Sequence, residues 1–182
     1  ALEAAAKPHP AGILPESSAN PRYLGCHDGL YLLFESPGQL LILDMHAASE
    51  RIRYEEILAQ LRARRVLSQG LLLPLELEAA HPEWEAFLPE LALLGFDAVL
   101  QNGRLTVRAV PAVLGNRPPE PVLDELFGAF SAGRTARETT LPLQERLAAT
   151  MACHSALRKN DPITPAMAME LFFTLQNTPS GG

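Results

Sequence analysis

The 182-residue sequence is short of positive charge. Fifteen Lys and Arg side chains face 21 Asp and Glu, so the formal net charge is −6 at pH 7. A protein that binds DNA by itself normally presents a broad basic face to the phosphates, so we expect this chain to bind DNA weakly when alone. The densest basic segments, 51–53 and 62–65, supply either a basic patch or a solvated helix face, and charge runs are more often the latter.

Cysteine and long apolar runs are also scarce. Cys26 and Cys153 are the two cysteines, and no signal-peptide pattern or long apolar run occurs. Neither secretion nor membrane insertion is indicated, and a reducing cytoplasm fits. No Gly-rich phosphate loop of the Walker type is present. The chain starts at Ala1 and stops at Ser180-Gly181-Gly182, which suggests a fragment of a longer protein.

Composition and local patterns predict the α+β class. Apolar residues make up 47% of the chain, and 16 prolines interrupt it. Turn residues separate short apolar runs, and periodic apolar stripes mark helices. Residues 1–21 are expected to be a linker. Thr164 is expected to cap the last helix, whose inner side should carry Met167, Leu171, Phe172 and Leu175. The expected strands are 23–26, 30–35, 39–43, 71–77, 98–101 and 104–110, and the expected helices are 44–64, 82–94, 121–130 and 143–158, with a polar connection at 133–140.

The densest cluster of chemistry is Asp44-Met45-His46-Ala47-Ala48-Ser49-Glu50. A helix that starts here places His46 and Glu50 one turn apart on one face, so the two side chains can share one ion. Asp44 stands where the strand ends and can either reach the same ion or cap the helix. Imidazole and carboxylate together suit zinc or manganese better than calcium. Without a metal, His46 faces solvent and Glu50 pairs with Arg53.

The segment Asp44-Met45-His46-Ala47-x-x-Glu50-x-x-x-x-Glu55 resembles the signature of nicking MutL proteins, usually written Asp-Gln-His-Ala-x-x-Glu-x-x-x-x-Glu. The resemblance implies that Asp44, His46 and Glu50 are catalytic metal ligands. Met45 replaces the usual glutamine, which removes no carboxylate ligand but can remove a buried polar contact.

A second segment, Ala152-Cys153-His154-Ser155-Ala156-Leu157-Arg158, resembles another helix of the same family. The resemblance implies that Cys153 completes the metal set, as a thiolate near a divalent ion would. A lone cysteine on a helix is otherwise most often a small buried hydrophobe. His154 lies about 100° round the helix from Cys153, so it is left out of the set and expected at the surface or near DNA.

A third segment, 68–74, resembles the peptide by which bacterial members bind the replication sliding clamp. A glutamine followed by aliphatic residues and a proline forms an extended peptide whose apolar side chains can fill a groove. The resemblance implies that the clamp-binding residues are Gln69, Leu72, Leu73 and Pro74. The alternative is that 71–73 is a core strand.

The family architecture implies a discontinuous dimerisation and metal-site subdomain, 22–74 with 141–182, and an inserted, smaller α/β external regulatory subdomain, 75–140. Homodimerisation comes from the resemblance. The first predicted sheet also has enough apolar residues for two buried faces, namely Leu30, Leu32, Leu33, Phe34, Leu40 and Leu41.

The resemblance implies a DNA mismatch repair protein, cytoplasmic and associated with the bacterial nucleoid, that nicks DNA by metal-assisted phosphodiester hydrolysis with Zn²⁺ and/or Mn²⁺. The mismatch-recognition protein and ATP would be bound through the full-length protein. Nicking members also have a Cys-Pro-His-Gly-Arg-Pro type segment near the position where this sequence stops, so the metal site is expected to be incomplete and this fragment weak or inactive. Alternatives are a non-catalytic dimerisation and partner-docking module and a structural zinc domain.

Overall fold

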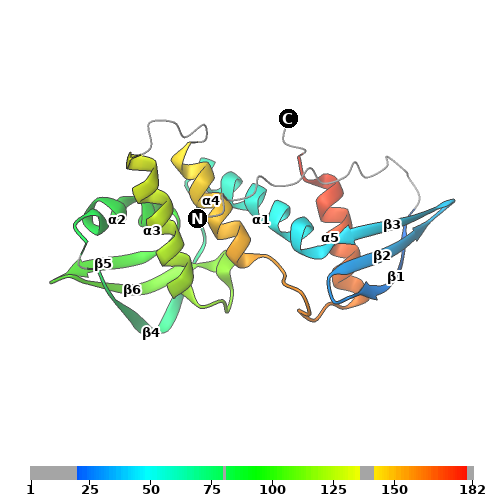
Figure 1. The fold of residues 1–182 in the computed structure, drawn as a ribbon, viewed down its shortest axis with the longest axis horizontal. Coiled ribbons are helices and arrows are strands. Elements are labelled where there is room, and N and C mark those ends of the chain that lie inside the picture. The colour runs from blue at the N-terminus through cyan, green and yellow to red at the C-terminus, as the bar shows by residue number, and fades with distance from the viewer. Residues whose placement is uncertain (1–19, 80, 136–141, 180–182) are drawn as a thin grey trace. The chain divides into compact units, whose positions relative to one another are not determined.

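The computed structural model describes residues 20–79, 81–135 and 142–179. Within these ranges the chain forms five α-helices and two three-stranded antiparallel sheets, which confirms the α+β class. The chain divides into two compact units, the first made of Ala1–Ile52 with Ala156–Gly182 and the second of Arg53–Ser155 (Figure 1). This division rests on backbone contacts. The predicted functional boundaries, 22–74 and 141–182 around 75–140, stay a prediction, and the linker 1–21 lies almost wholly outside the described residues.

The sheet of the first unit is a meander in the order β1-β2-β3, which confirms the three predicted strands. The strands are β1 (Arg22–His27), β2 (Tyr31–Ser36) and β3 (Gln39–Asp44). The turn from β1 to β2 needs positive φ at Asp28 and Gly29. A Cβ at Gly29 would also collide with the side-chain oxygen of Asn160, so glycine is favoured there on both grounds.

One face of this sheet packs against the start of helix α1 (Met45–Arg62) and against α5 (Pro165–Asn177). The core contains the buried side chains of Leu32, Phe34, Leu43, Met45, Ala48, Ala168 and Phe172. The rings of Phe34 and Phe172 lie 4.9 Å apart between centroids, in contact across the core. These apolar residues alternate along the strands and recur every three to four residues along the helices, so each element buries one face.

The start of α5 agrees with its predicted cap. The Thr164 hydroxyl accepts a hydrogen bond from the Met167 amide, and Pro165 occupies the first helical position. Phe172 is buried on the inner side, as predicted, and Leu171 and Leu175 pack at its edge. Met167 is 40% exposed, so its placement on the inner side was wrong. Ala168, one position later, is the residue that enters the core.

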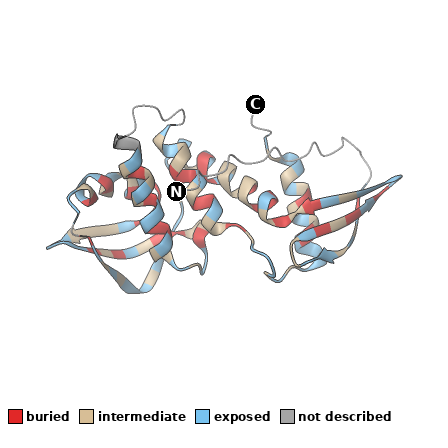
Figure 2. Ribbon diagram, viewed as in Figure 1, coloured by how far each residue is buried: buried red, intermediate tan, exposed pale blue. Residues whose placement is uncertain are grey.

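The second unit has a sheet in the order β4-β6-β5. Its strands are β4 (Ser68–Glu78), β5 (Asp97–Gln101) and β6 (Arg104–Pro111), and its helices are α2 (Glu83–Leu93), η1 (Ala112–Leu114), α3 (Pro119–Thr135) and α4 (Leu143–Ser155). The predicted hairpin is confirmed, with Asn102 and Gly103 both at positive φ. Buried residues line the sheet and helix faces that meet (Figure 2).

Two helix ends differ from their predictions. α3 continues through Gly133–Thr135, predicted as a polar connection, because one glycine in a helix costs only about 1 kcal/mol. The rest of that connection, 136–140, lies outside the described residues. α4 ends at Ser155 rather than near Arg158. The backbone of Leu157 instead bonds to side chains of α1. No helix in the described ranges is both long and apolar enough to span a bilayer.

We expect Phe172→Ala to lower the free energy of unfolding of this chain by about 3–5 kcal/mol, because it leaves a cavity against Phe34. Met167→Ala, on the same helix but exposed, should change it by less than about 0.5 kcal/mol. Urea unfolding followed by circular dichroism measures both. Equal losses in the two variants would contradict the assignment of the inner face of α5.

Candidate metal centre

The junction of β3 and α1 positions Asp44 as the cap of α1. Its Oδ1 accepts hydrogen bonds from the amides of His46 at 2.9 Å and Ala47 at 3.1 Å. These two amides belong to the first turn, which has no carbonyl partners within the helix. The capping interpretation of Asp44 is therefore confirmed. The cap uses only Oδ1, so the predicted role of Asp44 as a ligand stays a prediction.

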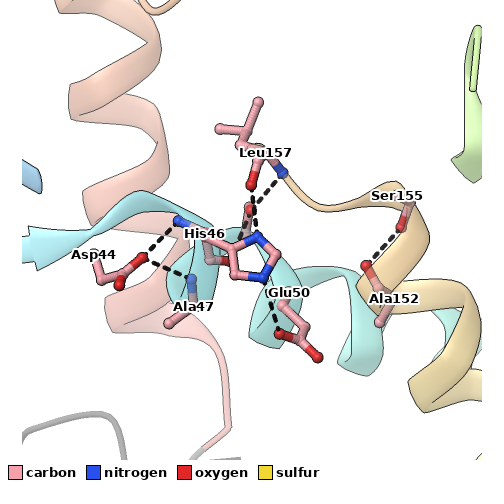
Figure 3. A network of polar contacts seen from close by, with 8 residues as sticks. Asp44, His46, Ala47, Glu50, Ala152, Ser155 and Leu157 are labelled. Atoms are coloured by element: carbon pink, nitrogen blue, oxygen red, sulfur yellow. Dashed lines mark hydrogen bonds and ion pairs between the residues drawn. The ribbon is translucent and has the colours of Figure 1, made fainter. Parts of the chain in front are cut away.

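His46 and Glu50 lie together on one face of α1, one turn apart, as predicted. His46 Nε2 is 3.7 Å from Glu50 Oε2, and the two side chains are 39% and 36% exposed. On the other side of the ring, Nδ1 lies 2.7 Å from the carbonyl oxygen of Leu157 (Figure 3). A carbonyl only accepts, so Nδ1 must carry the proton. In the neutral ring, Nε2 then presents its lone pair on the side of Glu50.

Ser49 lies between His46 and Glu50 in sequence, and its side chain is buried. Its hydroxyl donates to the carbonyl of His46 at 3.0 Å and accepts from the amide of Leu157 at 2.8 Å. We call this set of bonds, from Ser49 and His46 to the two backbone polar groups of Leu157, the Leu157 clasp (Figure 3). Sequence reasoning missed Ser49. The available signal was a serine one turn after the buried Met45, on the inner face of an apolar stripe.

The donor atoms of His46 and Glu50 fit one metal ion. Two ligands of a tetrahedral zinc ion, each about 2.1 Å from the metal, stand about 3.4 Å apart. The observed 3.7 Å is close to that spacing. The Nδ1 bond to a backbone carbonyl is also the partner that metal-binding histidines usually have. Among the described residues, however, no three His, Cys, Asp or Glu side chains gather to hold a metal.

Cys153 is exposed on α4, in the second unit, so its membership of this ligand set stays a prediction. The neighbouring His154 was left out of the set, which stays a prediction, but its expected place at the surface was wrong. Its side chain is only 12% exposed, and Nε2 lies 3.0 Å from Glu125 Oε2 on α3. A carboxylate partner within the same unit accounts for this histidine.

The segment predicted to bind the sliding clamp lies in β4, at the edge of the second sheet. β4 pairs with β6 through Gly70 and again from Leu75, and the residues between them bulge from the ladder. On this bulge Leu72 is 103% and Leu73 82% exposed, and Pro74 is exposed. The core-strand alternative is therefore wrong for these two leucines. Gln69 instead turns back and donates to the carbonyl of Gly115 at 2.6 Å.

The second face of the first sheet stays exposed within the single chain. Leu40 is 58% and Ile42 63% exposed, and both share this face with half-buried Leu33, which is directly opposite Ile42. Arg22 and Glu35 form an ion pair at 2.5 Å on the same face. Of the two sheet faces predicted to be buried, the chain itself buries only the one that packs against α1 and α5.

Comparison with known proteins matches residues 24–163 to the family described as MutL C terminal dimerisation domain. The DNA mismatch repair protein MutL of Anaeromyxobacter sp. (strain K) is 36% identical over 167 residues, which cover 88% of this chain and 27% of that protein. The MutL of Ralstonia nicotianae is 37% identical over 139 residues, covering 72% of this chain and 21% of that protein. The MutL of Neisseria meningitidis serogroup B is 35% identical over 160 residues, covering 83% and 24%.

The chain thus spans between a fifth and three tenths of the length of these relatives. The matched residues include the capped start of α1, the Leu157 clasp and the β4 bulge. By this match over most of its length, the chain belongs to the MutL C-terminal dimerisation domain family.

Proposed function

We propose that this chain is the homodimerising, metal-binding part of a DNA mismatch repair protein that nicks DNA, with Asp44, His46, Glu50 and Cys153 as its ligands. The observation that supports the site is the pair of His46 and Glu50, 3.7 Å apart, with the far ring nitrogen of His46 bonded to a backbone carbonyl. Such a pair is preorganised for binding a divalent ion.

A bound Zn²⁺ or Mn²⁺ would activate water and stabilise charge on the scissile phosphate. The chain's own residues would hold and orient it. His46 offers Nε2, Glu50 offers a half-exposed carboxylate, and Asp44 offers the oxygen that the cap leaves over. Cys153 would add a thiolate, which suits zinc. Among the described residues no three of these side chains stand together, so this chain alone is expected to nick DNA weakly or not at all.

The net charge of −6 favours a domain that depends on partners to reach DNA. Of the basic residues, Arg53 pairs with Glu56, and Arg51 donates to the carbonyl of Pro179. We propose that contact with the mismatch-recognition protein, and ATP binding, belong to other parts of the whole protein, which acts in the cytoplasm at the nucleoid.

The metal site is tested by zinc affinity, measured by competition with a chromophoric chelator. The parent chain is expected to bind zinc, and Glu50→Gln and Cys153→Ser each to weaken that binding by at least about tenfold. Cobalt substitution adds a direct readout, because a thiolate–cobalt band should vanish in Cys153→Ser.

Glu56→Gln and Cys26→Ser are the matched controls, since Glu56 pairs with Arg53 on the same helix and Cys26 is exposed on β1. Both should bind zinc as the parent does. Asp44→Asn retains an oxygen for the cap but loses the charge, so it separates ligand from cap. A parent chain without zinc affinity would instead support the non-catalytic dimerisation module, and affinity lost in Glu50→Gln but kept in Cys153→Ser would remove Cys153 from the set.

Homodimerisation is proposed through the exposed face of the first sheet. Leu33, Leu40 and Ile42 form an apolar strip along β2 and β3, and exposed apolar strips of this kind mark interfaces. A stable interface buries about 800 Å² on each partner, which a sheet face can supply. The second copy is the occupant expected of a dimerisation domain.

The double variant Leu40→Glu/Ile42→Glu should convert the dimer into a monomer, because it places four carboxylates in the apolar contact. Leu93→Glu is the matched control, since Leu93 is a similarly exposed leucine on α2 of the second unit. Sedimentation velocity of both variants at matched concentration measures the outcome. A double variant that sediments as the parent does would rule out this face.

Sliding-clamp binding is a second candidate function, supported by the exposure of Leu72 and Leu73 on the β4 bulge. Two fully solvated leucines on an edge strand serve no purpose in the core of this unit. They suit an apolar groove on a partner. Gln69 is held by the Gly115 carbonyl and would have to leave it in order to enter the same groove.

Leu72→Ala/Leu73→Ala should weaken binding to an immobilised bacterial sliding clamp by more than about tenfold, since a few apolar anchor residues contribute most of the binding free energy of such interfaces. The melting temperature should not change, because both side chains are exposed. Leu67→Ala, 67% exposed and just before β4, serves as the control. Equal binding by parent and double variant in surface plasmon resonance would contradict the clamp function.

A further inference from the structure

We propose that Ser49 is a positioning residue that selects the tautomer of His46 and so directs Nε2 toward the metal. This proposal rests on the proposed function of His46 as a ligand. Ser49 occupies a variable position of the motif, and the hydrogen bonds of its hydroxyl go to the backbone of His46 and of Leu157. Its effect would pass entirely through the Leu157 clasp.

The hydroxyl of Ser49 both donates and accepts a hydrogen bond. Only 5% of the residue is exposed, so an unpaired hydroxyl would be costly here. Its proton goes to the carbonyl of His46, three residues earlier, which is the usual choice of a serine within a helix. Its lone pair is therefore free to accept the amide of Leu157, 108 residues later.

Holding the amide of Leu157 also fixes its carbonyl. The chain leaves α4 at Ser155, and Leu157 lies in the irregular segment before α5, outside any helix or strand. With its amide bonded to Ser49, Leu157 turns its carbonyl onto the ring of His46. Ser49 thus binds the amide of Leu157 and His46 binds its carbonyl, so each hydrogen bond limits the orientations open to the other.

Two acceptors compete for the single proton of the neutral His46 ring. The Leu157 carbonyl lies 2.7 Å from Nδ1, within hydrogen-bond distance, whereas Glu50 Oε2 lies 3.7 Å from Nε2, beyond it. If the Leu157 carbonyl moved away, Glu50 would be the remaining acceptor and would draw the proton to Nε2. That tautomer blocks the nitrogen that the ion needs.

The test is the tautomer of His46 in the metal-free chain, read from long-range ¹H–¹⁵N correlation spectra at a pH well above the ordinary imidazole pKa of about 6.5. The parent should hold the proton on Nδ1. Ser49→Ala should lose that preference and show a substantial Nε2–H population, while Ser49→Thr, which keeps a hydroxyl, should retain the parent tautomer.

Ser155→Ala is the matched control, because the Ser155 hydroxyl also donates to a carbonyl three residues earlier, Ala152 at 3.1 Å, but does not contact Leu157 (Figure 3). It should leave the His46 tautomer unchanged. If Ser49→Ala fails to fold by circular dichroism, Ser49→Cys, with a similar shape and weaker bonding, replaces it with the same expectation.

A merely structural role for Ser49 would lower stability without changing the tautomer, and that result would overturn the proposal, as would a parent with the proton on Nε2. The zinc affinity of the folded variant should also fall by about 10–100-fold. A parent that binds no zinc but changes tautomer in Ser49→Ala would refute the proposed metal function and leave the positioning role of Ser49 intact, so the two failures are distinguishable.

Discussion

Leu157 is held by α1 through both of its backbone polar groups, and the first unit depends on that attachment. The unit is assembled from two segments far apart in sequence, and the bonds from Ser49 and His46 join positions separated by 108 and 111 residues. Closing so long a loop costs conformational entropy that two hydrogen bonds do not offset alone. The contact of Phe34 with Phe172 adds the apolar burial that keeps α5, and with it Leu157, beside the sheet. Lys159 adds an ion pair with Asp28, and the hydrogen bond and charge of Lys159 lower the pKa of the Asp28 carboxyl.

The elements that sequence predicts well are those whose ends are decided locally. Asn102-Gly103 closes its hairpin because both residues tolerate positive φ, and Thr164 and Asp44 cap helices with their own side chains. The end of α4 was predicted three residues too late because the residues that stop a helix in this part of the sequence, Asn160 and Pro162, come after Arg158. Its amide is taken by Ser49, a partner that local patterns cannot identify. His154 is a similar case, since burial against Glu125 depends on how α3 and α4 pack.

In the candidate site, too, the features set by local sequence were predicted and those set by distant contacts were not. Helical spacing alone places His46 beside Glu50, because residues four apart share a face. Whether Asp44 caps the helix depends on whether the helix begins directly after it, and in the structure it does. Met45, the one departure from the family signature, is fully buried in the core of the first unit. An apolar side chain is well suited to that buried position, and the departure removes no donor atom from the candidate site.

The two exposed apolar surfaces proposed as interfaces, both within the described residues, differ in shape. The strip of Leu33, Leu40 and Ile42 is part of a regular sheet face, where side chains of neighbouring strands lie level and a second broad surface can cover them. The leucines of the β4 bulge interrupt the edge of their sheet instead, and between Gly70 and Leu75 the strand has no regular pairing with β6. An interrupted edge is poorly suited to receive another strand. If Leu72 and Leu73 bind the proposed clamp, they would do so by inserting their side chains into a groove on that protein rather than by pairing with a strand.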